Sequence, residues 1–262
     1  KTIEIQADSI ASLSNQIDKS FAEIAKKVSL IKGKLIVMGV GKSGHVGQKV
    51  SATLASTGTP SFFIHPTEAA HGDLGMIAKD DAVLIFSNSG ETKEVTAILP
   101  ALKRMTSDIF SITGNANSSI AKASSVHLKV QVEKEACPHD LAPTSSTTAS
   151  MVIGDALAIS LIEEKNFSSE DFAKSHPAGE LGKKLTTYVG DLAISGNKVS
   201  CVEIEASIKD TIIEITSKKL GMALVVKDEE VVGIFTDGDL RRALNQEIDI
   251  ENNSVSSVMT KK

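Results

Sequence analysis

Cysteine is scarce in this sequence, and several other signals are missing altogether. The 262 residues include two cysteines, Cys137 and Cys201, and no CxxC pair, which excludes a zinc ribbon or a dithiol redox motif. We therefore expect a reduced intracellular chain. No apolar run reaches the roughly 18 residues of a membrane-spanning helix, and the first residues lack a signal-peptide core. Because the sequence does not begin with methionine, we expect it to start inside a longer protein.

An excess of positive charge is absent as well. Lysine and arginine total 28 against 33 aspartate and glutamate, so the net charge is −5 and the pI is near 5.7. Such a chain has no electrostatic footprint for nucleic acid or an anionic membrane, although a local basic pocket can still hold phosphate. No helix-turn-helix or basic DNA-binding segment is present. We expect a cytoplasmic protein whose partners include neither nucleic acid nor a membrane.

Over residues 1–185, short apolar runs alternate with helical patterns. Apolar residues at spacings of three and four predict one helix over 1–31 and further helices over 43–56, 92–105 and 145–165. The apolar runs that predict strands are 35–38, 62–64, 82–86, 109–112 and 126–130. Apolar strands separated by helices are typical of a parallel sheet with helices on both faces, so the fold class is α/β.

The pattern changes after residue 185. Residues 186–198 are rich in glycine, serine and asparagine, as in a linker. Residues 199–262 then predict a helix over 208–220, a hairpin of strands 222–226 and 231–235, and a short helix over 237–245. A unit of only about 70 residues is marginal by itself, so we expect it to lean on a partner.

A glycine-rich segment, GVGKSG at residues 39–44, joins a strand to a helix. Its glycines let the backbone turn sharply, and the helix amino end offers free N–H groups to an anion at Gly41, Lys42 and Ser43. Its glycines fit the dinucleotide pattern GxGxxG, but the acidic residue expected about 20 positions on is missing, and the Walker pattern fails because Lys42 precedes the last glycine. A tight strand-to-helix turn is the plain alternative.

Hydroxyl side chains gather in two further segments, SNSGET at 87–92 and TSSTT at 144–148. A helix start needs one hydroxyl as its N-cap, and these segments contain more than capping requires. The hydroxyl residues of interest are Ser87, Ser89, Thr92, Ser145, Ser146 and Thr147. All three segments are expected at the carboxyl ends of strands, the usual ligand crevice of an open α/β sheet. Together they predict one phosphate-binding site.

These segments resemble the sugar isomerase (SIS) family. The resemblance spans residues 35–185 and also includes STGTPSFFIHPTEAAHGDLG, KEACP, LAPTSSTT and SHP. It is strongest to members that interconvert ribulose 5-phosphate and arabinose 5-phosphate. Near the end, GIFTDGDLRR at 233–242 resembles the cystathionine-β-synthase (CBS) motif, a module that those members carry after the SIS domain, normally as a pair. The resemblance implies a flavodoxin-like three-layer SIS domain over 1–185 and a small α+β CBS-type domain over 199–262, whose pair is incomplete.

The implied activity is an aldose–ketose isomerisation. A proton moves between carbons 1 and 2 through an enediol, which needs a base and an electrophile but in principle no metal or other cofactor. The resemblance implicates Lys42, Glu94, Glu135 and His176 as the catalytic set. Glu135 is favoured as the base. His176 suits ring opening or proton shuttling, because the pKa of histidine lies near neutrality.

Each of these residues also has a plain structural interpretation. Glu135 could pair with Lys134, His176 could cap a helix, Lys42 could be a solvated loop lysine, and Glu94 could be a surface partner of a lysine. Two departures from the family, Ala178 and Glu180, flank His176 and should not remove its chemistry.

The resemblance adds further binding residues, namely Gly58, Thr59, His65 and His71. The two histidines could hydrogen-bond sugar hydroxyls, and His65 is a weak candidate for adventitious, inhibitory zinc. The resemblance also implies a homo-oligomer, expected to be a tetramer, with sites at subunit boundaries. His176 is then expected to serve a neighbouring subunit.

In the CBS-type domain, Thr236 and Asp237 could contact the ribose of a nucleotide-type effector, with a packing module as the alternative. Residues 257–260 resemble the start of a second repeat. The product would feed synthesis of eight-carbon sugar acids for lipopolysaccharide or capsule. Two other functions stay open: a non-catalytic phosphosugar sensor, and a dinucleotide-dependent enzyme, which the missing ribose-binding acid disfavours.

Overall fold

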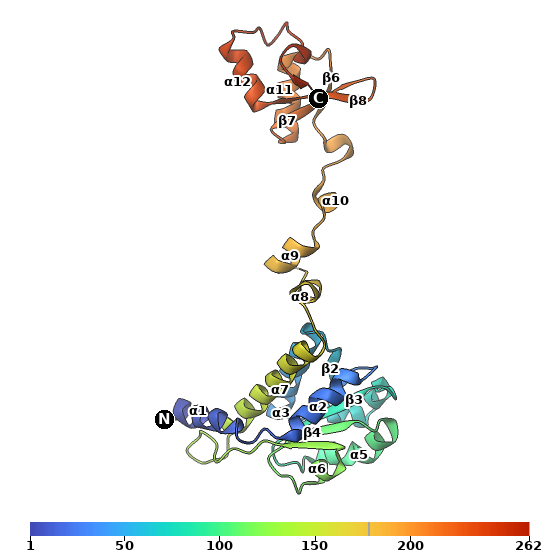
Figure 1. Cartoon of the computed structure of the whole chain (residues 1–262), viewed down its shortest axis with the longest axis vertical. Coiled ribbons are helices and arrows are strands. Elements are labelled where there is room, and N and C mark those ends of the chain that lie inside the picture. Colours follow the sequence, from blue (N-terminus) through green and yellow to red (C-terminus); the bar gives the residue numbers. More distant parts are fainter. Residues whose placement is uncertain (178, 262) are drawn as a thin grey trace. The chain divides into compact units, whose positions relative to one another are not determined.

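The computed structural model describes residues 1–177 and 179–261, and it divides into two compact units, Lys1–Thr186 and Thr187–Lys262 (Figure 1). Ala178, one of the two residues that flank His176 in the sequence, lies outside the described residues. The first unit contains all the predicted catalytic residues, and the second contains the CBS-type sequence.

The first unit is built on a five-stranded sheet. Its strands are β1 (Leu35–Gly39), β2 (Ser61–Phe63), β3 (Ala82–Ser87), β4 (Ile109–Thr113) and β5 (Val126–Lys129). All neighbours pair in parallel, in the order β2-β1-β3-β4-β5. Every residue of β1, β3 and β4 is buried, as a sheet covered on both faces requires. The predicted α/β class with a parallel sheet is confirmed.

Helices cover both faces of this sheet. The helices of this unit are α1 (Thr2–Leu13), α2 (Lys19–Leu30), α3 (Lys42–Ser56), α4 (Pro66–Ala70), α5 (Lys93–Met105), α6 (Ser119–Ala123), α7 (Ser145–Glu164), α8 (Ser169–Ser175) and α9 (Glu180–Thr186), with a 3-10 turn at Asp73–Met76; α8 and α9 pack on each other and follow the helices that cover the sheet. Alternate residues of β1 and β3 point into two separate cores. Leu35 and Leu84 pack with α2, α3 and α7, whereas Ile36 and Val83 pack with α4, α5 and α6.

The prediction of one helix over residues 1–31 is wrong. The chain turns after Leu13, and α2 begins at Lys19. Asp18 has an extended backbone, and its carboxylate accepts a hydrogen bond of 2.8 Å from the Ser20 N–H, which is an N-cap that starts a new helix. The apolar stripe runs through both helices, so periodicity alone concealed the break.

Helix α7 is the long core helix of the unit. Among the described residues it is the one helix long and apolar enough to cross a membrane by length and composition, with a mean hydropathy of 1.3. Burial inside the unit accounts for its apolar side, because Ala149, Ile153, Leu157 and Leu161 are each at most 2% exposed in the first core. On another side of α7, Ile159 is 53% exposed.

The second unit contains a four-stranded mixed sheet in the order β6-β7-β8-β9. Its elements are α10 (Val189–Leu192), a 3-10 turn (Gly196–Lys198), β6 (Cys201–Glu203), α11 (Ile208–Lys218), β7 (Met222–Lys227), β8 (Glu230–Thr236), α12 (Asp237–Asn245), a 3-10 turn (Val255–Ser257) and β9 (Thr260–Lys261). The predicted hairpin is present as antiparallel β7 and β8. Asp228 and Glu229 join them at φ values of 50° and 65°, the left-handed geometry of a tight hairpin turn.

Helices α3 and α7 pack closely at Gly154, and this contact can be tested. A Cβ atom at Gly154 would lie 2.3 Å from Cγ2 of Val50, a branched side chain buried in the core. We expect Gly154→Ala to lower the free energy of unfolding by about 1–2 kcal/mol, because overpacking outweighs the roughly 1 kcal/mol gain in helix propensity. Urea unfolding measures the change.

The matched control is Gly75→Ala, since a Cβ atom at Gly75 meets nothing within 4 Å. We expect that variant to unfold at nearly the same urea concentration as the parent. A Gly154→Ala protein as stable as the parent would show that α3 and α7 can separate without loss of packing.

Candidate active site

The strand order reverses direction between β1 and β3, and a pocket lies beside this switch point. In open α/β sheets, ligands bind in the crevice at the carboxyl ends of the strands where the order reverses. The pocket has a volume of about 180 Å³. It is lined by Val40, Lys42, Ser43, Val46, Asn88, Pro143, Ser146, Thr147 and Ser150. The three segments singled out in the sequence thus surround one cavity, which we call the Lys42 pocket.

The glycine segment brings the start of α3 close to the end of β1. A Cβ atom at Gly39 would lie 2.8 Å from the Ser43 carbonyl oxygen, so only glycine allows the helix to begin so near the strand. Gly41 is the N-cap and has a φ of 59°, which side chains rarely adopt. Lys42, the exposed first residue of the helix, therefore brings its charge to the pocket.

The serine segment uses most of its hydroxyl groups to hold its own shape. The buried Ser87 and the half-buried Thr92 share a hydrogen bond of 2.8 Å between their hydroxyls, and the Gly90 N–H donates to Ser87 Oγ. Ser89 Oγ accepts from the Glu91 N–H at 3.2 Å. In this segment, Asn88 is the residue that lines the Lys42 pocket. Our sequence reasoning missed Asn88, although its position directly after β3 could have pointed to it.

The amino end of α7 holds the Glu135 carboxylate. Glu135 Oε2 accepts hydrogen bonds from the backbone N–H groups of Thr144 (2.7 Å) and Ser146 (3.2 Å) and from the Thr144 hydroxyl (3.1 Å). Its Oε1 accepts from the Ser146 hydroxyl. Glu135 thus bonds to Thr144 and Ser146, whereas the plain alternative had paired it with Lys134. Because Ser146 also lines the Lys42 pocket, Glu135 lies one side chain away from that pocket.

These contacts set the charge of Glu135. Burial raises the pKa of its carboxyl group, but the hydrogen bonds from Ser146 and Thr144 lower it by more, and the pKa stays below its ordinary value. The positive end of the 20-residue helix α7 acts in the same direction. Glu135 is therefore an anion at neutral pH.

His176 lies away from the Lys42 pocket in a single chain. It follows the last residue of α8, its ring stacks on Phe172 with centroids 4.0 Å apart, and its Nδ1 lies 3.0 Å from the Phe172 carbonyl oxygen. The neighbouring Ser175 hydroxyl donates to the carbonyl oxygen of Ser56, the last residue of α3. Lys42 is the first residue of that 15-residue helix, so the two ends lie about 21 Å apart.

The other predicted site residues also lie outside the lining of the Lys42 pocket. Thr59 is fully buried and accepts a hydrogen bond of 3.0 Å from Lys165 Nζ, which is a structural role at the opposite edge of the sheet. Gly58 has a φ of 90° and packs against Phe167. His65 caps α4 through its Nδ1, which accepts from the Thr67 N–H at 3.2 Å.

His71 follows the end of α4, and Glu94 is exposed in the first turn of α5. Ser145 is fully buried at the first position of α7. Among the described residues, no group of three histidine, cysteine or acidic side chains could hold a metal ion. Inhibitory zinc at His65 remains a prediction.

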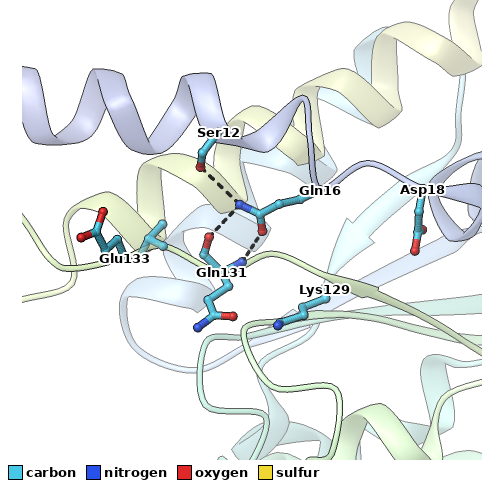
Figure 2. A pocket seen from close by; sticks show the side chains of 7 residues that line it. Ser12, Gln16, Asp18, Lys129, Gln131 and Glu133 are labelled. Atoms are coloured by element: carbon cyan, nitrogen blue, oxygen red, sulfur yellow. Dashed lines mark hydrogen bonds between the residues drawn. The ribbon is translucent and has the colours of Figure 1, made fainter.

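A larger cleft lies elsewhere on the first unit, between the corner that joins α1 to α2 and the segment that follows β5 (Figure 2). Its volume is about 440 Å³, and six of its seven lining residues are polar or charged. Figure 2 shows the Gln16 amide bonded to both backbone groups of Gln131, at 2.9 and 2.8 Å. None of the predicted site residues lines this cleft. The Gln16 contacts give it a structural role, fastening the first two helices to the sheet.

Comparisons with known proteins identify the families of the two units. Residues 31–160 match the model of the SIS domain, and residues 189–246 match that of the CBS domain. The chain is 50% identical over 261 residues to the arabinose 5-phosphate isomerase KdsD of Escherichia coli K12, covering 99% of this chain and 80% of that protein. Identity to the KdsD of Pseudomonas aeruginosa is 49% with the same coverage. A solved E. coli CFT073 protein in complex with arabinose 5-phosphate is 44% identical, with a TM-score of 0.66, covering 67% of this chain and 94% of that one.

The hydrogen bonds on Glu135 predict a pH-dependent contribution to stability. Its folded-state pKa lies below the ordinary value of 4.5, so the unfolded chain binds the proton more readily. The stabilisation is therefore present above the unfolded-state pKa and is lost as the pH falls through the folded-state pKa. We expect Glu135→Gln to be less stable than the parent at about pH 7 and this difference to narrow below about pH 4.

Urea unfolding of both proteins at the two pH values measures this difference. Glu133→Gln is the control, because Glu133 lies two residues before Glu135 and lines the other cleft, the one that contains Gln16. A stability difference between Glu135→Gln and the parent that stayed constant with pH would contradict the assignment.

Proposed function

The chain belongs to the arabinose 5-phosphate isomerase family of SIS-domain proteins, and on this basis we propose that it interconverts D-ribulose 5-phosphate and D-arabinose 5-phosphate. The single observation that carries the proposal is its similarity to KdsD over nearly its whole length. The Lys42 pocket supports it, because hydroxyl residues of the glycine segment and of α7 line it together with Asn88 of the serine segment, beside a lysine.

The reaction is a proton transfer within one molecule. From the ketose, a base removes a proton from carbon 1, and the carbonyl oxygen on carbon 2 takes on enediolate charge. A proton then returns to carbon 2, and the proton of the carbon 1 hydroxyl moves to the oxygen on carbon 2, which leaves an aldehyde on carbon 1 and a hydroxyl on carbon 2. Atoms and electrons balance without any acceptor, so we propose that no cofactor is required.

The residues near the pocket suit distinct parts of this reaction. Lys42 is a cation at the amino end of α3, and it can stabilise the phosphate or the enediolate. Glu135 is an anion next to the pocket and the candidate base. His176 is the candidate for ring opening of the aldose, whose carbon 4 hydroxyl can close onto the aldehyde. Glu94 belongs to the predicted set, but its position at the start of α5 does not indicate its role.

We also propose a homo-oligomer, expected to be a tetramer, in which His176 completes the site of another subunit. The length of α3 supports this, because one chain alone holds His176 far from Lys42. Exposed apolar residues such as Ile159 on α7 and Ile3 on α1, which is 84% exposed, supply surface for such contacts.

The CBS-type unit is the proposed place for an effector of the nucleotide type. The Thr236 hydroxyl already donates to Asp239 at 2.6 Å within the capping box of α12. A ribose contact would therefore depend on Asp237, which is exposed. A packing role for this unit is the alternative. We further propose a cytoplasmic enzyme whose product feeds the eight-carbon sugar acids of lipopolysaccharide or capsule.

Isomerase activity has a direct test. We expect the purified chain to convert ribulose 5-phosphate to arabinose 5-phosphate in the presence of a chelator and without added cofactor. Lys42→Ala should lower kcat/KM by about 10²–10³-fold, as expected when a group that stabilises developing charge is lost. Identification of arabinose 5-phosphate by NMR measures the activity. Tight binding of the sugar phosphate without any product would instead favour the phosphosugar sensor.

Sharing of the site between subunits can be tested by mixing two inactive variants. We expect Lys42→Ala and His176→Ala chains to recover part of the parental activity when their subunits exchange, because some sites then combine an intact Lys42 with a neighbour's intact His176. Mixed oligomers of proven composition that show no activity would overturn the shared site.

A further inference from the structure

Ser146 bonds to Glu135 and also lines the Lys42 pocket. Its hydroxyl donates to Glu135 Oε1, and the same residue lines the Lys42 pocket with Ser43 and Thr147. A serine hydroxyl has one proton and can donate it to only one acceptor at a time. An anionic oxygen that accepted this proton from the pocket side would therefore take it away from Glu135.

The amino end of α7 attracts anions in its own right. Two N–H groups at this end, those of the N-cap Thr144 and of Ser146, already donate to a carboxylate. The hydroxyl of Ser145, at the first position of the helix, is fully buried and has no hydrogen-bond partner among the described residues. Glu135 is thus an internal anion on a helix end that an incoming phosphate or enediolate would also favour.

Thr144 joins the Glu135 backbone segment to this helix end. Its Oγ1 accepts from the Ala136 N–H at 2.8 Å and donates to Glu135 Oε2 at 3.1 Å. The loop beyond has hydrogen bonds of its own, since the Glu135 N–H donates to Asp140 and two backbone N–H groups donate to Cys137 Sγ. The Glu135 side chain can therefore leave α7 by rotation about its own bonds while the loop keeps these contacts.

We propose that Thr144 is a positioning residue that holds Glu135 on the amino end of α7, and that an anion entering the Lys42 pocket competes with Glu135 for the Ser146 proton. Once displaced, the carboxylate has fewer donors on its lone pairs and is a stronger base beside the substrate. The inference rests on the proposed function only for the identity of the anion; the competition itself requires no catalysis.

The test measures binding of inorganic phosphate to the whole chain by calorimetry, at neutral pH and fixed ionic strength. We expect Glu135→Gln to bind phosphate about tenfold more tightly than the parent, because the neutral amide competes weakly for the donors. Thr144→Val keeps the Glu135 charge but loses one donor to it, and should bind phosphate about threefold more tightly. Thr144→Ser, which keeps the hydroxyl, should restore the parental affinity.

The variants separate competition from simple repulsion. If Glu135 only repelled phosphate, Glu135→Gln would bind more tightly, whereas Thr144→Val would match the parent, and the positioning role would be overturned. Weaker binding by Thr144→Val would mean that its hydroxyl contacts phosphate directly, which also overturns the proposal. Unchanged affinity in Glu135→Gln would exclude competition altogether. Glu133→Gln controls for the loss of one nearby charge.

A pH profile gives a second measurement. Loss of the Thr144 hydroxyl should raise the pKa of Glu135 toward its ordinary value, so the acidic limb of kcat/KM should move to higher pH in Thr144→Val and return in Thr144→Ser. An unmoved limb in Thr144→Val would count against the positioning role. If the chain binds phosphate as expected but makes no product from ribulose 5-phosphate, the proposed function fails and the competition stands.

Discussion

Parallel pairing of the strands is the constraint on which the site depends. All five strands of the first sheet end at the same edge, and the order β2-β1-β3-β4-β5 changes direction between β1 and β3. The segments after those two strands must therefore diverge to opposite faces, and a gap opens between them. The amino end of α7 closes that gap with Ser146 and Thr147, so backbone topology brings together groups that lie more than 100 positions apart in the sequence.

Beside that gap, hydrogen bonds from the end of α7 determine the charge of the Glu135 carboxylate. Burial of Glu135 works against its charge, and hydrogen bonds at the end of a 20-residue helix favour the charge by more. The same contacts that keep Glu135 ionised also occupy its lone pairs. An anion held in this way is restrained from acting as a base, so the proposed role of Glu135 as the base requires that these hydrogen bonds can be released.

Alternating apolar runs predicted the α/β class, the strands and most helix positions, because burial on both faces leaves a plain pattern. The break at Asp18 escaped the pattern, since the apolar stripe continues across it. In the site, glycine and hydroxyl composition predicted the convergence of the three segments. Composition could not reveal that the Ser87 hydroxyl bonds within its own turn or that Glu135 caps α7. Both hydrogen bonds join residues whose distance depends on the fold. Asn88 was missed because one amide carries no compositional signal.

Helix α3 carries a different part of the structure at each of its two ends. One end carries the glycine turn and Lys42, and the other holds the Ser56 carbonyl, to which Ser175 is fastened. Near the middle of α3, Val50 packs closely against Gly154 of α7. Because a single helix carries both groups, its length of about 21 Å fixes the spacing between Lys42 and the Ser56–Ser175 contact.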